Sequence, residues 1–178
     1  MPERSAAEIS ILPAGGVEPR LGELAALMRD CVHAGASINF VLPFSMADSE
    51  GFWRTRILPD VRAGTRVLFI AEVDGRIVGT VQLDHGTPPN QPHRAEVAKL
   101  MVHPDFRGHG LARGLMGALE AHARRLGRTL ITLDTRTGDA AEPLYASLGY
   151  ETAGIIPGFC RDTVEDRYDP TTVMYKHL

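Results

Sequence analysis

Four residues between positions 107 and 113 have the types and spacing of an anion-binding loop. Arg107 and Arg113 are basic, and Gly108 and Gly110 lie between them. Glycine lets backbone N–H groups approach a ligand closely, and a helix that begins there directs its free N–H groups and positive dipole end at the same point. The chemistry that this loop predicts is the binding of a phosphate or pyrophosphate group.

Two common phosphate-binding loops do not fit this segment. A Walker loop requires Gly-x-x-x-x-Gly-Lys followed by Ser or Thr, which the sequence lacks. The dinucleotide fingerprint Gly-x-Gly-x-x-Gly fails because Arg113 stands at its last position. An ordinary tight turn with a helix cap is the alternative interpretation without a ligand.

Two carboxylates at strand ends form a second group with chemical potential. Glu96 lies at the start of an apolar strand, and Asp134 ends the strand that contains Leu130, Ile131 and Leu133. Open α/β sheets place their ligand crevice at strand ends. Solvated strand termini are the alternative, and it applies less well to Asp134 because its strand is otherwise apolar.

The elements that position these residues follow from apolar periodicity. A strand over Ala95–Val102 stops before Pro104, which cannot extend a ladder. The helix after Gly110 has one apolar face, made of Leu111, Leu115, Leu119, His122 and Leu126. A further strand is expected over Thr129–Asp134.

The rest of the chain completes an α/β pattern. Alternating apolar residues around the Asp74-Gly75 turn predict a hairpin, and Ser45 with Asp48 is typical of a helix N-cap. The expected elements before the central strand are a strand over Ile9–Leu12, closed by Gly15-Gly16, helices over Pro19–His33 and Met46–Leu58, and hairpin strands over Arg66–Val73 and Arg76–Asp84. The order predicts a mixed central sheet with helices on both faces.

Composition restricts the class of protein. The chain of 178 residues has 44% hydrophobic residues and a net charge of −3, which fits one domain over residues 1–178 and gives no general attraction for nucleic acid. No apolar run reaches the length of a membrane span. Cys31, Cys160 and seven dispersed histidines predict free thiols, a cytoplasmic location and no metal site. The oligomeric state stays open, a homodimer included.

Two motifs resemble one enzyme family. Arg107-x-x-Gly110-x-Ala112 after an apolar strand is similar to the coenzyme A pyrophosphate signature of the GCN5-related N-acetyltransferases (GNAT), and the segment Ala141–Tyr150 resembles the later helix of that family. The resemblance implies transfer of an acetyl group from acetyl-CoA to an amine. It also implies that the strands Glu96–Val102 and Thr129–Asp134 splay apart to hold the pantetheine arm.

The resemblance assigns roles to individual residues. Tyr145 is the expected proton donor to the departing CoA thiolate, with packing at the sheet rim as its alternative role. Glu96 and Asp134 are expected as the base and the amine anchor, with the assignment between them and a relaying water left open. The residues expected to bind the cofactor are Leu100, Met101, Val102, Arg107, Gly108, His109, Gly110, Leu111, Ala112 and Arg113. The family often has Asn where this chain has Gly138, so part of the pantetheine contact must differ.

The acceptor is less defined. Ser37, Asn39, Phe40 and Trp53 are candidates for its pocket wall, although Phe40 and Trp53 fit a core role better. The Pro-rich segment Thr87–Pro92 is expected to close the site over a small molecule. A small amine is therefore favoured over a protein or peptide acceptor and over a non-catalytic acyl-CoA sensor.

Within the family, three short runs are most similar to the tabtoxin-resistance acetyltransferases. These runs are Glu96–Met101, Leu133–Thr135 and Ile156–Phe159. The similarity implies an acceptor that resembles an amino acid or a dipeptide, and a role in toxin or antibiotic resistance, with a housekeeping amine as an equally open alternative.

Overall fold

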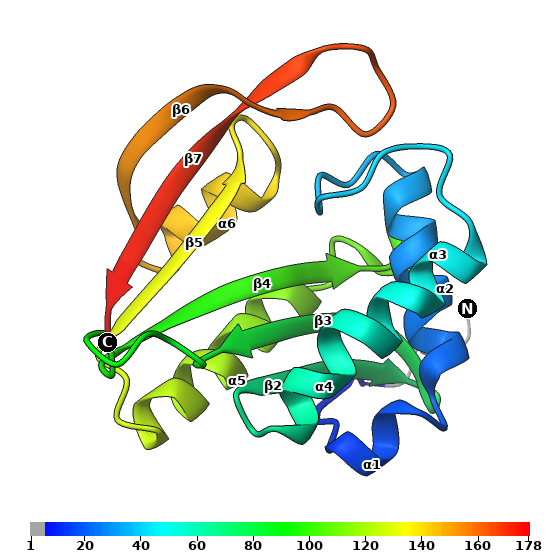
Figure 1. The fold of residues 1–178 in the computed structure, drawn as a ribbon, viewed down its shortest axis with the longest axis horizontal. Coiled ribbons are helices and arrows are strands. Elements are labelled where there is room, and N and C mark those ends of the chain that lie inside the picture. The colour runs from blue at the N-terminus through cyan, green and yellow to red at the C-terminus, as the bar shows by residue number, and fades with distance from the viewer. Residues whose placement is uncertain (1–5) are drawn as a thin grey trace.

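The computed structural model describes residues 6–178 as a seven-stranded mixed sheet with helices on both faces (Figure 1). The strand order is β1-β2-β3-β4-β5-β7-β6. The strands are β1 (Glu8–Ile11), β2 (Arg66–Val73), β3 (Arg76–Asp84), β4 (Arg94–Val102), β5 (Leu130–Arg136), β6 (Glu151–Arg161) and β7 (Tyr168–His177). The predicted fold class is confirmed.

The two faces are covered by different helices. On one face α5 (Leu111–Arg125) and α6 (Ala141–Ser147) pack against the sheet, and their buried side chains include Leu115, Leu119 and Tyr145. The other face carries the elements that precede the hairpin, which are α1 (Ala14–Val17), α2 (Leu21–His33), α3 (Met46–Phe52), the π-helical turn η1 (Trp53–Ile57) and α4 (Leu58–Arg62). None of the helices within residues 6–178 is long and apolar enough to cross a membrane.

The hairpin β2–β3 has the predicted bounds. Asp74 and Gly75 both have positive φ angles, +51° and +76°, as the tight turns that join twisted antiparallel strands require. Ser45 and Asp48 form the predicted capping box at the start of α3. The turn at Asp74-Gly75 and the N-cap at Ser45 are therefore both present as the sequence predicts.

Other boundaries differ from the expectation. The Gly15-Gly16 pair does not simply close β1 but forms the helical turn α1, and the next helix begins at Leu21 instead of Pro19. The single helix expected over Met46–Leu58 is divided into α3, η1 and α4, and Pro59 lies in the first turn of α4, where its missing N–H is tolerated. Leu126 follows the end of α5 and is 40% exposed, so it does not belong to the buried face.

Strands β4 and β5 are the elements that open the site. They are parallel and pair only at their beginnings, through the pairs Arg94–Leu130, Ala95–Ile131 and Glu96–Thr132. Beyond these residues the two strands diverge, as Figure 1 shows from their common origin near the C-terminus. The predicted splay between neighbouring parallel strands is therefore present.

Candidate active site

A cavity of about 700 Å³ lies where β4 and β5 diverge. Its walls come from six parts of the chain: the end of α2 with the segment after it, strand β4, the loop before α5 with the start of that helix, the end of β5 with α6, the end of β6, and Thr171 of β7. Glu96, Asp134 and Tyr145 all line this cavity. The structure thus brings together the three residues that the sequence selected for catalysis.

The loop before α5 has the geometry of an anion-binding site. Gly108 and Gly110 have φ angles of +79° and +77°, a conformation that costs free energy for residues with a side chain. Within residues 6–178, no partner accepts a hydrogen bond from the backbone N–H groups of residues 108–113. These groups, together with the positive end of the α5 dipole, are available to a bound phosphate.

The two arginines of this loop are exposed, and each donates one hydrogen bond to a neighbouring protein group. The Arg107 Nε donates a hydrogen bond of 3.1 Å to the Val102 carbonyl oxygen, and an Arg113 terminal nitrogen donates one of 2.7 Å to the Ser147 hydroxyl. Both side chains line the cavity. Their remaining donors are free to meet an anion that lies on the loop.

His109 is the only residue of the expected cofactor set that does not line the cavity. Its Nδ1 lies 2.8 Å from the Arg107 carbonyl oxygen and 3.3 Å from that of Phe106. The imidazole ring therefore stabilises the loop from within. The backbone N–H of His109 has no hydrogen-bond acceptor within residues 6–178.

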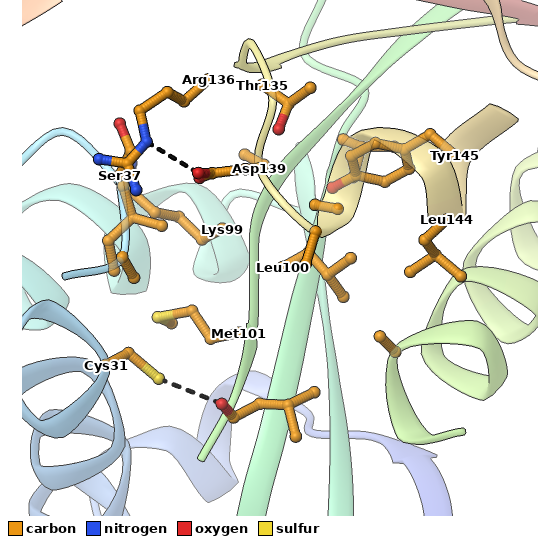
Figure 2. A pocket seen from close by; sticks show the side chains of 18 of the residues that line it. Cys31, Ser37, Lys99, Leu100, Met101, Thr135, Arg136, Asp139, Leu144 and Tyr145 are labelled. Atoms are coloured by element: carbon orange, nitrogen blue, oxygen red, sulfur yellow. Dashed lines mark hydrogen bonds and ion pairs between the residues drawn. The ribbon is translucent and has the colours of Figure 1, made fainter. Parts of the chain in front are cut away.

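Tyr145 reaches the cavity from α6. Figure 2 shows its ring directed from that helix toward Leu100 on β4. Burial raises the pKa of the Tyr145 phenol well above its usual range, and the negative charge of Asp134 adds to the increase. The phenol therefore carries its proton at neutral pH, as a proton donor must.

The start of α6 is held by a carboxylate from within the helix. Gly138 has a φ of +86°, and its N–H donates a hydrogen bond of 2.6 Å to a Glu142 carboxylate oxygen. The other Glu142 oxygen accepts a hydrogen bond of 3.0 Å from the Thr172 hydroxyl. Glu142 therefore fixes the orientation of the helix that carries Tyr145.

The two carboxylates differ in their surroundings. Asp134 accepts a hydrogen bond of 3.1 Å from the Thr171 hydroxyl. The Glu96 side chain is 49% exposed and lies 3.3 Å from an Arg94 guanidinium nitrogen. Both carboxylates retain oxygen lone pairs for a substrate, because neither contact occupies all the acceptor sites of a carboxylate.

Lys99 is a site residue that sequence reasoning missed. It lies in a β-bulge of β4 with a φ of +52°, lines the cavity, and is only partly exposed. Burial lowers the pKa of Lys99 to about 8, with Arg66 adding to the decrease and Asp134 opposing it. The available signal was a lone lysine inside the otherwise apolar run Val97–Val102 of the central strand.

The four residues expected at the acceptor pocket lie in three different surroundings. Ser37 and Asn39 line the first cavity, and Phe40 lines a second, adjacent cavity. Trp53 is completely buried among the core side chains of α2 and α4, so its core role is confirmed.

The Pro-rich segment Thr87–Pro92 lines neither cavity, which makes its expected role as a lid wrong. The loop that contains it connects β3 to β4 and contacts Arg128, whose guanidinium donates to the carbonyl oxygens of Pro92 and His85. It therefore lies near the beginning of β5, whereas the cavity opens toward the other end of that strand.

Two other loops, after α2 and between β6 and β7, meet at one end of the cavity. The Leu42 N–H donates to the Thr163 carbonyl oxygen at 2.9 Å, and the Thr163 hydroxyl donates to the Ala36 carbonyl oxygen at 3.0 Å. Arg136 on β5 donates to the Gly35 carbonyl oxygen at 3.2 Å and contacts Asp139 at 2.9 Å (Figure 2). We call residues 35–42 and 160–167 together the roof, because these hydrogen bonds join the two segments and because Ser37, Asn39 and Cys160 of these segments line the cavity.

The described residues contain two free cysteines, and both lie at the cavity. Cys31 and Cys160 are free thiols and both line the first cavity, and burial raises the pKa of Cys31 to about 11. Among residues 6–178, no group of three or more His, Cys, Asp or Glu side chains is arranged to hold a metal ion.

Comparison with known proteins gives one consistent family. Residues 37–150 match the sequence model of the acetyltransferase (GNAT) family. The chain is 33% identical over 126 residues to an uncharacterized N-acetyltransferase from the hisH–hisA intergenic region of Azospirillum brasilense, which covers 69% of this chain and 72% of that protein.

Solved structures show the same fold. An N-acetyltransferase from Staphylococcus aureus Mu50 superposes with a TM-score of 0.79 at 16% identity, covering 97% of this chain and 99% of that one. The putative acetyltransferase yncA from Salmonella typhimurium, solved with its cofactor acetyl-CoA, superposes with a TM-score of 0.77 at 19% identity, covering 98% and 95%.

Proposed function

The chain is a member of the GNAT family of acetyl-CoA-dependent N-acetyltransferases, and we propose that the amine it acetylates belongs to a small molecule. The observation that carries this proposal is the roof, which joins two loops by hydrogen bonds above the acceptor end of the cavity. The two joined loops leave less room for a long chain than the open groove that a peptide substrate needs, which favours a compact acceptor.

The first part of the proposal concerns the cosubstrate. The N–H groups of residues 108–113 and the side chains of Arg107 and Arg113 fit the pyrophosphate of coenzyme A, because they offer unpaired donors and positive charge at a helix N-terminus. Leu100, Met101 and Val102 on the diverging edge of β4 line the path for the pantetheine arm. Acetyl-CoA supplies the acetyl group as an activated thioester.

The second part concerns proton transfer at the leaving sulfur. Tyr145 holds a proton on its phenolic oxygen at neutral pH, since burial raises its pKa. No group within residues 6–178 makes a hydrogen bond with that oxygen, so its proton is available to a ligand in the cavity. Tyr145 is accordingly the general acid of the proposal.

The third part concerns the acceptor amine. An ammonium group has no lone pair, so a base must remove a proton before attack. Glu96 and Asp134 line the cavity from neighbouring strands and are the carboxylates available to anchor and deprotonate the amine. In this proposal the amine attacks the thioester carbonyl directly, and Cys31, with a pKa raised to about 11, is a poor thiolate nucleophile.

The resemblance to the tabtoxin-resistance acetyltransferases supports a narrower acceptor class. Glu96 and Lys99 belong to the first similar run, and Asp134 belongs to the second. We infer that the acceptor resembles an amino acid or a dipeptide, and that acetylation inactivates a toxin or an antibiotic of that kind.

A panel of acceptors tests the proposal. Purified protein and acetyl-CoA are mixed with amino acids, polyamines, dipeptides or aminoglycosides, and the release of free thiol is followed. The proposal predicts release with at least one class of small amine, together with an acetylated product of that amine. Acetylation restricted to proteins or long peptides would overturn the small-molecule assignment.

A further inference from the structure

A second cavity of about 560 Å³ adjoins the acceptor end of the first. The two cavities share four lining residues: Asn39, Glu96, Ala98 and Lys99. The rest of the second cavity is lined by Phe40 from the loop after α2 and by residues of α3, η1, α4, β2 and β3. It is therefore a side chamber that an acceptor can enter from the point where its amine meets Glu96.

The side chamber is lined by three acidic and three basic side chains, but they are not evenly paired. Arg66 lies 3.1 Å from Asp60 and 2.7 Å from Asp84, so that one arginine engages two carboxylates. The third acid, Glu96, is 3.3 Å from Arg94. Within residues 6–178, the other two cations of the chamber, Lys99 and Arg56, have no carboxylate within salt-bridge distance.

Lys99 is the more confined of these two cations. Its ammonium nitrogen lies 5.7 Å from the ring centre of Phe40 and 5.6 Å from that of Phe52, within the range of cation–π contact. Ring faces replace only part of the hydration that a buried ammonium loses. The lowered pKa of Lys99 has the same cause, because burial disfavours its charged form. A cation in this situation gains from a ligand anion.

A β-bulge in β4 places Lys99 where the two cavities meet. The register between β3 and β4 shifts between Thr80 and Gln82, and Lys99 occupies the bulge with a left-handed φ of +52°. A residue with a side chain adopts this conformation at a cost in free energy, and such costs concentrate at functional sites. The bulge sets the direction of the Lys99 side chain, and Lys99 lines both cavities.

We propose that the side chamber receives an anionic group of the acceptor, such as a carboxylate, and that Lys99 is the residue that recognises it, with Arg56 at the chamber wall. The inference rests on the proposed function and makes its acceptor zwitterionic. Glu96 and Asp134 take the ammonium end, and Lys99 takes the anionic end. Lys99 thereby selects among small amines, since an amine without an anion leaves the ammonium of Lys99 unpaired.

Matched acceptors test this inference. Each amino acid or dipeptide of a panel is compared with its C-terminal amide, which keeps the amine and side chain but removes the carboxylate. The expected kcat/KM of the wild type is higher for the acid than for the amide by about ten- to one-hundred-fold, the usual worth of a charged hydrogen bond. In Lys99→Met the ratio falls to near one, mainly through the KM of the acid, and in Lys99→Arg most of it returns.

Arg54 provides the matched control. It lies in η1 two residues before Arg56, but it pairs with Glu50 at 3.4 Å and does not line the chamber. Arg56→Met is expected to lower the preference for acids, and Arg54→Met to preserve it. Arg56→Met also keeps the inference testable if Lys99→Met fails to fold, which a melting curve shows.

The outcomes separate the inference from the proposed function. Equal use of acids and amides by the wild type, or a preference that persists in Lys99→Met, overturns the inference and leaves the acetylation of small amines in place. A protein that binds acetyl-CoA but acetylates no small amine overturns the proposed function, and the inference with it.

Discussion

At the scale of single residues, the two neighbouring tyrosines Tyr145 and Tyr150 differ in whether a ligand in the cavity can reach their hydroxyl groups. Their ring centres lie 5.7 Å apart, and burial raises the pKa of both phenols. Only Tyr145 lines the cavity, whereas the Tyr150 hydroxyl is enclosed in the core near Glu120. A proton held by Tyr145 can reach a ligand, and one held by Tyr150 cannot.

This difference predicts the behaviour of two matched variants. Tyr145→Phe removes the proposed general acid and is expected to lower kcat by about 10²- to 10⁴-fold, with little change in the dissociation constant of acetyl-CoA. Tyr150→Phe removes a similar hydroxyl outside the cavity and is expected to keep kcat. Steady-state rates and calorimetry measure both quantities. A normal kcat in Tyr145→Phe would rule out the acid role.

Lys99 predicts a pH dependence with a definite sign. Its pKa of about 8 means that the ammonium is present below pH 8 and is lost as the pH rises through that value. Arg66 from β2 and Asp134 from β5 are the charged groups that act on it with opposite effects. The KM for an acid acceptor is therefore expected to increase above pH 8, while the KM for the matching amide does not show this increase.

The control for this prediction is Lys99→Arg, because a guanidinium stays protonated throughout the range. Its KM for the acid is expected to vary less between pH 7 and about 9.5 than that of the wild type. Parallel changes in acid and amide for the wild type would show that another group titrates.

At the scale of elements, the turn that begins α5 joins backbone conformation to ligand binding. Gly110→Ala places a side chain at a φ of +77°, which costs about 1–2 kcal/mol in this region and shifts the N–H groups that follow. The expected result is weaker binding of acetyl-CoA by calorimetry and a lower Tm.

Gly117 is the control within the same helix. A Cβ there meets open space, so Gly117→Ala is expected to stabilise α5 by up to about 1 kcal/mol and to keep the affinity for acetyl-CoA. Unchanged affinity in Gly110→Ala would contradict the assignment of the loop to the cosubstrate.

Elements governed by local chemistry were predictable from the sequence. The Asp74-Gly75 turn defined the bounds of β2 and β3, the Ser45–Asp48 box defined the start of α3, and the glycine pair at 108 and 110 defined the start of α5. In each case the deciding interaction lies within a few residues along the chain.

Features that depend on distant contacts were not predictable in this way. The bulge at Lys99 arises from the pairing of β4 with β3, and its alternation pattern carries no mark of the inserted residue. The location of Thr87–Pro92 depends on Arg128, more than thirty residues later, so a proline-rich composition indicated a loop but not the side of the sheet.

At the scale of the whole molecule, Arg136 ties together segments that are far apart in the sequence. It contacts Gly35, Asp139, Asp162 and Asp169, and its side chain is only 17% exposed. The roof therefore depends on one guanidinium, with Arg167 as a second partner of Asp162 and Asp169.

Removal of that guanidinium tests the roof. Arg136→Met leaves buried carboxylates short of a partner and is expected to lower the free energy of unfolding by about 3 kcal/mol, and to raise the KM for the acceptor. Arg161→Met is the control, because its pair with Asp166 is exposed and is worth less than about 1 kcal/mol. Equal stability of the two variants in denaturant titrations would contradict this account of the roof.

The most direct measurement is a crystal structure of the protein with acetyl-CoA. Our account predicts the pyrophosphate on the N–H groups of residues 108–113, the pantetheine arm between the diverging strands β4 and β5, and the thioester sulfur within hydrogen-bonding distance of the Tyr145 hydroxyl. A cosubstrate that lies elsewhere, or a sulfur remote from Tyr145, would contradict it.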